Sequence, residues 1–354
     1  MSPKERNTDN PAHERRGGLW PLSVAPMMDR TDRHFRWFLR LLSRRVLLYS
    51  EMVTTGAIRH GDREKILGFS EEERPLVLQL GGDDPRELAE SAKVGEELGY
   101  DEINLNVGCP SDAVQRGRFG VCLMKDPKRV ADGVTEMRAA VSVPVTVKHR
   151  IGVDDLDRYE DMLAFVETVA AAGCDRFMVH ARKAWLNGLS PKQNRSVPPL
   201  RYEDVHRLKR EHPELVIEIN GGIRTVDEIC EHLALTDGVM IGRAMYDDPM
   251  LLARAAREIL GEPTEAPTRR ELLEAMIPYV ETWHARGEPV KNLVRHLHGL
   301  FAGIPGAGEW KRFLARHALK RGAEPTVLRE ALGVLPADTL DRPVAAAGPL
   351  SRTG

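Results

Sequence analysis

Glu102-Ile-Asn-Leu-Asn-Val-Gly-Cys-Pro110 has the pattern of a buried strand that ends in a turn. Apolar residues alternate with Asn104 and Asn106, and Gly-Cys-Pro then stops the strand and leaves the thiol of Cys109 at its end. An asparagine amide without a partner is costly to bury, so two of them here indicate contact with a ligand. A small buried cysteine beside a structural turn explains the same residues equally well at this point.

Segments of the same strand character recur along the chain, and helical segments separate most of them. Together with 102–110, the predicted strands are 22–28, 46–53, 75–82, 144–152, 176–182, 216–222 and 238–244. The helix expected over 84–98 has Asp84 as its cap, Pro85 at its first position and Gly99 after its end. Further helices are expected from 126 onward, over 156–172, and over 225–235, where Thr225 and Glu228 have the spacing of a capping box. This alternation predicts an α/β fold of the (β/α)8 TIM barrel type.

A doubly wound sheet is the competing architecture. It requires a glycine-rich turn after the first strand, whereas this chain has Ala25-Pro26-Met27-Met28 there. In a barrel the active site lies at the carboxyl ends of the strands. The predicted strand ends carry functional or unusual residues in every case: Pro26, Met27, Met28, Glu51, Gln79, Gly81, Gly82, Asn104, Asn106, Cys109, Lys148, Arg150, His180, Arg182, Asn220, Gly221, Gly222, Gly242 and Arg243.

The last two strand ends together predict a phosphate site. Loops after the seventh and eighth strands of a barrel often bind phosphate through backbone N–H groups, and glycine lets the backbone approach the anion. Gly221, Gly222 and Gly242 supply such positions, and Arg243 adds a cation. A tight turn without any ligand remains the alternative for Asn220-Gly221-Gly222.

Composition limits the class of protein. The chain has 354 residues and a formal net charge of −2, so no global excess of positive charge indicates a nucleic-acid partner. No apolar run approaches the ~20 residues that span a bilayer, and no signal-peptide core begins the chain. Its cysteines form no C-x-x-C pair, which predicts a cytoplasmic protein with free thiols and no metal site. Nothing indicates a protein partner, so we expect a monomer.

Four regions are expected. Residues 1–18 and 336–354 are predicted to be disordered tails, residues 19–262 to form the barrel, and residues 263–335 to form a small helical domain. Helices are expected there over 269–285, 290–301 and 309–321. The second half of this domain is basic, which suits a nucleic-acid surface but also an ordinary solvated face: Lys291, Arg295, Lys311, Arg312, Arg316, Lys320 and Arg321.

Five motifs now carry a resemblance to a known family. They are Ser-Val-Ala-Pro-Met-Met-Asp-Arg-Thr-Asp at 23–32, Asn-Val-Gly-Cys-Pro-Ser at 106–111, Val-Lys-His-Arg-Ile-Gly at 147–152, His-Ala-Arg-Lys-Ala-Trp-Leu at 180–186 and Ile-Asn-Gly-Gly-Ile at 219–223. The chain resembles the tRNA-dihydrouridine synthases over about 22–313. The fourth motif, with Leu-Ser-Pro-Lys-Gln-Asn-Arg after it, resembles the A subfamily.

The resemblance implies a flavin mononucleotide (FMN) enzyme that uses NADPH to reduce uridine in the D-loop of tRNA, at position 20 and in some members also 20a. It implies that Cys109 is the proton donor. It also implies that Pro26, Met27, Met28, Gln79, Lys148 and His180 surround the flavin ring, that Asn220, Gly221, Gly222, Gly242 and Arg243 bind the flavin phosphate, and that Asn106, Lys192, Arg195, Lys311 and Arg312 contact tRNA. Ala113 and Gly308 depart from the family, which often has arginine at both places.

The chemistry that follows is hydride addition to carbon 6 of uracil and protonation of carbon 5. The resemblance implies that the hydride comes from the flavin and the proton from Cys109, whose class of side chain is mostly protonated near neutral pH. A nucleophilic cysteine is the rival role, and a Schiff-base role is the rival for Lys148. The target base must flip out of the folded tRNA. Two other functions remain open: an FMN-dependent reductase of a small pyrimidine or enone, and a non-catalytic RNA-binding barrel.

Overall fold

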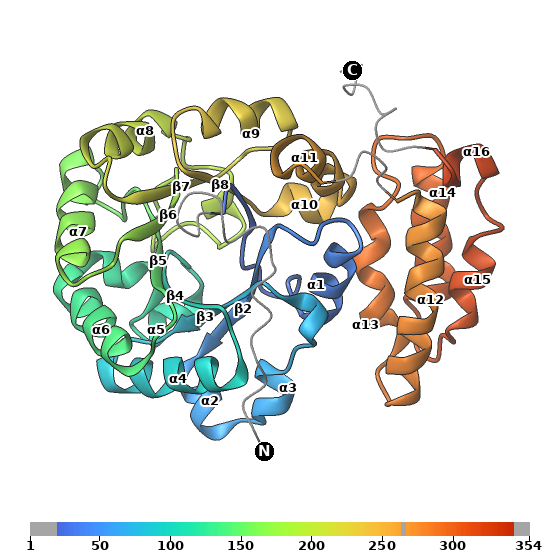
Figure 1. The fold of residues 1–354 in the computed structure, drawn as a ribbon, viewed down its shortest axis with the longest axis horizontal. Helices are drawn as coiled ribbons and strands as arrows, with labels where there is room; N and C mark the ends of the chain where they lie inside the picture. Colours follow the sequence, from blue (N-terminus) through green and yellow to red (C-terminus); the bar gives the residue numbers. More distant parts are fainter. Residues whose placement is uncertain (1–19, 263–266, 343–354) are drawn as a thin grey trace.

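The computed structural model describes residues 20–262 and 267–342. Within these residues the chain forms a closed barrel of eight parallel strands, each paired with its neighbours in sequence order and the last paired with the first. The barrel occupies one side of the molecule in Figure 1. The predicted (β/α)8 barrel is confirmed. Its strands are β1 (Leu22–Val24), β2 (Leu47–Thr54), β3 (Leu76–Gly81), β4 (Glu102–Val107), β5 (Val145–Arg150), β6 (Arg176–His180), β7 (Val216–Asn220) and β8 (Gly238–Ile241).

Strand β4 shows how alternation produces the two faces of the barrel wall. Ile103, Leu105 and Val107 are fully buried and belong to the main hydrophobic core, together with helix residues outside the barrel. Asn104 and Asn106 have the opposite parity, so they face the barrel interior, and they pair in register with Thr146 and Lys148 of β5. The interior is thus polar along this strand, whereas its outer face packs against helices.

Helices surround the barrel, as Figure 1 shows. The caps predicted from sequence are present: Asp84 accepts hydrogen bonds at the start of α4, Gly99 after it has a φ of 95°, and Thr225 forms a capping box with Glu228 at α9. The barrel helices are α1 (Arg33–Arg40), α2 (Thr55–His60), α3 (Arg63–Leu67), α4 (Pro85–Leu98), α5 (Asp112–Arg116), α6 (Pro127–Ala140), α7 (Tyr159–Ala171), α8 (Tyr202–Glu211), α9 (Val226–Leu233), α10 (Arg243–Asp247) and α11 (Met250–Leu260), with 3-10 turns η1 (Glu71–Glu73), η2 (Gly120–Lys125) and η3 (Gln193–Arg195).

The remaining helices lie together beside the barrel, next to α1 and α10 (Figure 1). We call residues 267–342 the C-terminal helical region. At its centre Trp310 is fully buried, and its indole N–H donates to the carbonyl of Leu297 at 2.8 Å. The elements of the region are α12 (Arg269–Ala285), α13 (Val290–Val294), the 3-10 helix η4 (Arg295–Gly299), α14 (Ala307–Phe313), the π-helix η5 (Leu314–Ala318), α15 (Thr326–Ala331) and α16 (Ala337–Leu340).

Two helix predictions for this region were too simple. The helix expected over 290–301 changes from α13 to the 3-10 helix η4 at Arg295, and the helix expected over 309–321 changes from α14 to the π-helix η5. The helix expected over 156–172 begins only at Tyr159, because Val153 and Leu156 form an antiparallel bridge before it. Local periodicity does not report such changes of backbone pitch.

The predicted tail 336–354 was partly wrong. Residues Ala337–Leu340 form α16, Leu340 is buried, and Asp341 pairs with Arg270 of α12. The Pro- and Ala-rich composition of this segment predicts disorder, but Leu340 within it packs into the C-terminal helical region. Residues 343–354, the predicted tail 1–18 and the start of the predicted helical domain, 263–266, lie outside the described residues. Among the described helices, none has the length and apolar character to cross a bilayer.

Candidate active site

A ladder of amides crosses the barrel interior below its carboxyl end. Gln79 of β3 donates to Asn104 of β4 at 2.8 Å and accepts from Asn106 at 2.8 Å. Asn104 in turn donates to the hydroxyl of Thr146 at 2.9 Å. All are buried, and each hydrogen bond joins neighbouring strands, so the cost of burying these amides is offset. The ladder fixes the direction in which Asn106 points.

Asn106 forms the turn that presents Cys109. Its side-chain oxygen accepts from the backbone N–H groups of Gly108 at 3.1 Å and Cys109 at 2.9 Å. This Asx turn bends the chain immediately after β4. Cys109 is partly exposed, and its sulfur lies 3.6 Å from the hydroxyl oxygen of Ser111. The thiol therefore stands at the carboxyl end of the barrel on a turn that the buried amide ladder supports.

Lys148 and His180 lie on the adjoining strands β5 and β6 at the same end. The Lys148 ammonium donates to the side-chain oxygen of Asn220 on β7 at 3.3 Å. Burial, and then the nearby Arg150 guanidinium, lower the pKa of Lys148 to about 8. Burial and the surrounding cations, Arg150 foremost, lower the pKa of His180 well below its ordinary value, so its ring is neutral at pH 7. The site thus has a cation that titrates near neutral pH beside a neutral imidazole.

Gly221 and Gly222 form the turn after β7, where the sequence predicts a phosphate site. Gly221 has a φ of 125° and Gly222 a φ of 77°, and Tyr202 donates to the carbonyl of Gly221 at 2.6 Å. A methyl group at Gly221 would lie 2.8 Å from Cδ2 of His180. Both backbone conformations are ones that residues with side chains rarely adopt. The turn after β7 therefore brings bare backbone next to His180, as close approach of an anion requires.

Gly242 and Arg243 follow β8 on the neighbouring side. Gly242 directly precedes α10, and a methyl group there would lie 3.5 Å from Cβ of Ala25 and from Sδ of Met27. Arg243 donates to the backbone carbonyl of Arg195 at 2.9 Å. Pro26 and Met27 are partly buried in the turn after β1, whereas Met28 is 53% exposed. The turns after β1 and β8 thus meet at Gly242.

Arg150 is the principal residue whose role the sequence did not reveal. It is buried at the end of β5 and donates to the carbonyls of Gly108 at 2.8 Å, Lys183 at 3.1 Å and Asn194 at 3.0 Å. It therefore connects the turn before Cys109 with the loop 183–195 after β6. Its place at a strand end was visible, but its acceptors come from two distant loops.

The loop 183–195 carries two of the predicted tRNA contacts, Lys192 and Arg195, and both are exposed. Asn194 is fully buried within it and bonds to both the N–H and the carbonyl of Trp185. The Lys183 ammonium lies 3.9 Å from the centre of the Trp185 ring. The loop is thus a compact structure held from inside, with Lys192 and Arg195 exposed on its surface.

The other predicted tRNA contacts differ in exposure, because two are exposed and one is buried. Lys311 and Arg312 are exposed on α14, in the C-terminal helical region, and therefore far along the chain from Cys109. Asn106 is buried, and both ends of its amide make the protein contacts described above. Gly308 is exposed on α14, whereas the side chain of Ala113 lies outside the described residues. Within residues 20–262 and 267–342, no group of three or more His, Cys, Asp or Glu has the arrangement of a metal site.

The residues at the carboxyl end fit an anionic, aromatic cofactor: a cation and a neutral imidazole face it from β5 and β6, and bare backbone lies after β7. A (β/α)8 barrel with this site is of the class that contains flavin oxidoreductases. The family model "Dihydrouridine synthase (Dus)" matches residues 23–333, and the chain belongs to that family. It is accordingly an enzyme, an FMN-dependent oxidoreductase.

Curated relatives are similar over nearly their whole length. A tRNA-dihydrouridine(20/20a) synthase of Synechocystis sp. is 58% identical over 312 residues, 88% of this chain and 93% of that protein. Those of Salmonella typhi and Escherichia coli K12 are 52% and 55% identical, covering 95% and 88% of this chain and 99% and 90% of theirs. A solved 2-naphthoyl-CoA reductase complex shares the fold, with a TM-score of 0.51, 11% identity and coverage of 71% of this chain; the chain spans about half of that protein's length (51%).

Proposed function

We propose that this enzyme reduces uridine in tRNA to 5,6-dihydrouridine, with Cys109 as the proton donor. The observation that carries the proposal is the turn at Cys109: a free thiol at the carboxyl end of the barrel, fixed through Asn106 to the amide ladder, in a chain that belongs to the dihydrouridine synthase family. A thiol at the open end of the barrel can donate the proton that saturation of a carbon–carbon double bond requires. Reduction of a small pyrimidine or enone alone is not favoured, because the relatives are named for tRNA.

FMN fits the residues around the strand ends. Lys148 and His180 would face its ring, together with Gln79 and the turn Pro26-Met27-Met28. Asn220, Gly221, Gly222, Gly242 and Arg243 would bind its phosphate, since their backbone is open and one side chain is cationic. Bound flavin supplies the two-electron reduction of the substrate, with NADPH as the source of electrons.

The residues around Cys109 favour its role as an acid. After the thiol gives its proton to carbon 5 of the uracil ring, a thiolate remains in the site. Lys148 and Arg150 lie close enough to interact with that charge. Both cations would attract the negative charge that remains on the sulfur after the proton is transferred.

The RNA would contact exposed cations on the loop after β6 and on the C-terminal helical region. Lys192 and Arg195 lie on the loop 183–195, and Lys311 and Arg312 lie on α14. Extrusion of the target base costs on the order of a few kcal/mol, which contacts to phosphate and to tRNA shape would offset. We place the modified uridines at positions 20 and 20a, as in the names of the relatives, and the enzyme in the cytoplasm as a monomer.

The decisive experiment measures dihydrouridine by mass spectrometry in tRNA from a synthase-deficient host that expresses this chain. The wild-type protein is expected to restore the modified base. Cys109→Ala is expected to abolish it while retaining flavin, and Cys122→Ala, a second partly buried cysteine in η2, serves as the matched control. Full activity of Cys109→Ala would refute the acid role, and absence of dihydrouridine with the wild-type chain would refute the function.

A further inference from the structure

The boundary between the barrel and the C-terminal helical region contains a partly buried ionic contact that no part of the mechanism uses. Asp32 caps α1: its Oδ1 accepts from the backbone N–H groups of His34 and Phe35, both at 3.0 Å. Its Oδ2 accepts from the guanidinium of Arg295, and Nε2 of His296 lies 3.1 Å from the same oxygen. One carboxylate therefore begins a barrel helix and also binds two consecutive residues of η4.

The contact is partly buried, and the Arg295 side chain in it is 37% exposed. The side chain of His296 is fully buried and that of Asp32 is 20% exposed. Burial alone raises the pKa of Asp32, but its bonds to His296, Phe35 and Arg295 outweigh burial and bring that pKa well below its ordinary value. The carboxylate thus stays charged at neutral pH, and its partners across the boundary are charge-assisted donors.

Asp32 is also linked to the turn at the barrel mouth. Thr31, next to it, accepts from the backbone N–H of Met27 at 2.9 Å through its hydroxyl, and its own N–H donates to the carbonyl of Met27 at 3.0 Å. This turn carries the residues after β1 that we assign to the flavin. Asp32 is therefore rigidly connected to one wall of the active site.

His296 also contacts the helix that follows the neighbouring strand β8. Its ring centre lies 5.5 Å from that of Phe35 in α1 and 5.9 Å from that of Tyr246 in α10. Tyr246 follows Gly242 and Arg243 after β8, and the Arg30 guanidinium lies 4.4 Å over its ring. His296 thus inserts between the loops that follow the first and last strands of the barrel.

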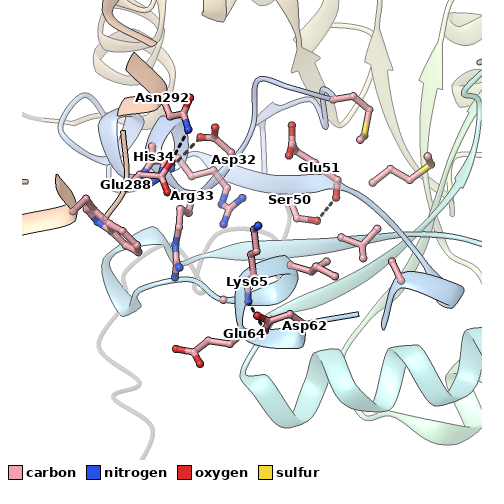
Figure 2. Close-up of a pocket in the computed structure, with 18 of the residues that line it drawn as sticks. Asp32, Arg33, His34, Ser50, Glu51, Asp62, Glu64, Lys65, Glu288 and Asn292 are labelled. Carbon is pink, nitrogen blue, oxygen red and sulfur yellow. Dashed lines mark hydrogen bonds between the residues drawn. The ribbon is translucent and has the colours of Figure 1, made fainter. Parts of the chain in front are cut away.

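Little else fills the space on one side of this contact. A cleft of about 810 Å³ opens between the two parts of the chain. Figure 2 shows Asp32, His34 and Glu51 from the barrel on one side, with Glu288 and Asn292 from the C-terminal helical region close to Asp32. Elsewhere the two parts pack directly, since the rings of Trp37 and Tyr279 stack with centres 4.0 Å apart, so the contact of Asp32 lies where this packing gives way to an open cleft.

We infer that Asp32, through Arg295 and His296, is a positioning residue that sets the RNA-binding helices at the distance and angle from Cys109 that uridine reduction requires. The inference rests on the proposed function, because it assigns the basic side chains of α14 to the same tRNA whose base enters the barrel. Misplacement of reacting groups by about 1 Å can cost ~100-fold in rate, so a small rotation at this boundary is sufficient.

A purely structural role for Asp32 makes a different prediction. A stabilising ion pair would change the melting temperature but leave turnover per folded, flavin-loaded enzyme unaltered. A positioning role lowers turnover at saturating tRNA, while flavin content and flavin reduction by NADPH stay as in the wild type, because the barrel site is intact. Saturation with tRNA removes the effect that loss of the Arg295 cation has on affinity.

The test uses Asp32→Asn and Arg295→Gln in the full-length holoenzyme. Asp32→Asn retains an oxygen for the α1 cap but directs an amide at Arg295, and Arg295→Gln leaves the cap untouched in case the first variant does not fold. Arg270→Gln is the matched control, because Arg270 pairs with Asp341 inside the C-terminal helical region, away from the boundary.

We expect dihydrouridine formation at saturating tRNA to fall about 10- to 100-fold in both boundary variants and to remain near wild type in Arg270→Gln. Wild-type turnover per flavin in Asp32→Asn or Arg295→Gln would overturn the inference, as would loss of flavin, which would show that Asp32 acts on the cofactor turn instead. Failure of the wild-type enzyme to modify tRNA would refute the proposed function itself, so the two failures are distinguishable.

Discussion

The side-chain oxygen of Asn106 accepts a hydrogen bond from the backbone N–H of Cys109 at 2.9 Å. The same amide donates to Gln79 at 2.8 Å. The position of the thiol is thus determined inside the barrel, on the neighbouring strand β3, and not by the surface loop that carries it. This relationship leads to the first of five predictions.

Asn106→Ala is expected to lower turnover about 10- to 100-fold, because the turn loses the acceptor that fixes the thiol. Gln79 also loses a partner, which costs about 1–3 kcal/mol of unfolding free energy. Turnover per bound flavin separates the two effects. Ser111→Ala, which removes the hydroxyl 3.6 Å from the sulfur but leaves the turn, serves as the control and should change turnover little. Equal losses in both variants would contradict this role of Asn106.

Gly221→Ala is expected to reduce the flavin content of the purified protein. The new methyl group would lie 2.8 Å from His180, at a φ of 125°. Gly261→Ala is a matched control, because its φ of 62° also disfavours a side chain but nothing lies within 4 Å of the added methyl group. Strain at either position costs about 1–3 kcal/mol, so only the difference in flavin absorbance reports on the cofactor site. Equal flavin in both variants would count against a flavin site at this turn.

Arg176→Met is expected to destabilise the barrel by about 3–5 kcal/mol, measured by urea unfolding. Arg176 binds Glu102 at 2.7 Å and also Glu218, all three buried in the barrel interior. Burial already raises the pKa of Glu102. Without Arg176 the folded state binds a proton there, so the variant should lose further stability as pH rises. Arg129→Met, which removes an exposed pair with Asp83, should have little effect at any pH.

The contribution of His34, at the boundary between the barrel and the C-terminal helical region, to the free energy of unfolding should decrease at acid pH. Burial lowers the pKa of His34 to about 4, from 6.5 in the unfolded chain. The unfolded chain therefore binds the proton more tightly, so the contribution of His34 is complete above pH 6.5 and decreases as pH falls toward 4. Between pH 7 and pH 5 the loss amounts to about 2 kcal/mol.

His34→Gln should reduce that difference between the unfolding free energies at pH 7 and pH 5. Comparison of wild type and variant at each pH cancels the contributions of other histidines of low pKa, such as His149. Glutamine retains a polar group near the Tyr279 hydroxyl, which lies 2.8 Å from the His34 ring. An unchanged pH dependence in the variant would show that His34 does not titrate in this range.

Lys311→Gln combined with Arg312→Gln is expected to weaken tRNA binding and to reduce the slope of log affinity against log salt by about 1 for each phosphate that the variant no longer neutralises. Both side chains are exposed on α14. Arg329→Gln is the control, because it removes a cation from α15 that pairs with Glu281. Titrations at several salt concentrations measure the slopes, and identical slopes for all three proteins would exclude α14 from the interface.

The barrel was predictable because each strand carries its own pattern. Ile103, Leu105 and Val107 alternate with polar residues, and the caps of α4 and α9 are local in sequence. The family was predictable for a similar reason, because its motifs are short segments at strand ends. The changes of pitch in η4 and η5 and the burial of Leu340 were not, because they depend on packing between distant helices.

The candidate site was predictable as a set of residues but not as a network. Strand order places Gln79 next to Asn104, yet the sequence does not state which amide donates to which. Arg150 was visible at its strand end, but its acceptors belong to loops whose paths the sequence does not specify. Asp32 stands in a family motif, and its partners lie more than 260 positions further along the chain.

Trp310 offers an intrinsic fluorescence probe of the C-terminal helical region. Its ring is fully removed from water and its N–H is bonded to Leu297, so its emission should lie at short wavelength in the native protein and shift to the red when the helices separate. Trp283 also belongs to this region, and it lies at the cleft beside the barrel. Replacing it with phenylalanine would leave Trp310 as the tryptophan of this region. Subtracting the emission of a variant that also lacks Trp310 removes the signal of Trp20, Trp37 and Trp185, while the absorbance of bound flavin follows the barrel independently.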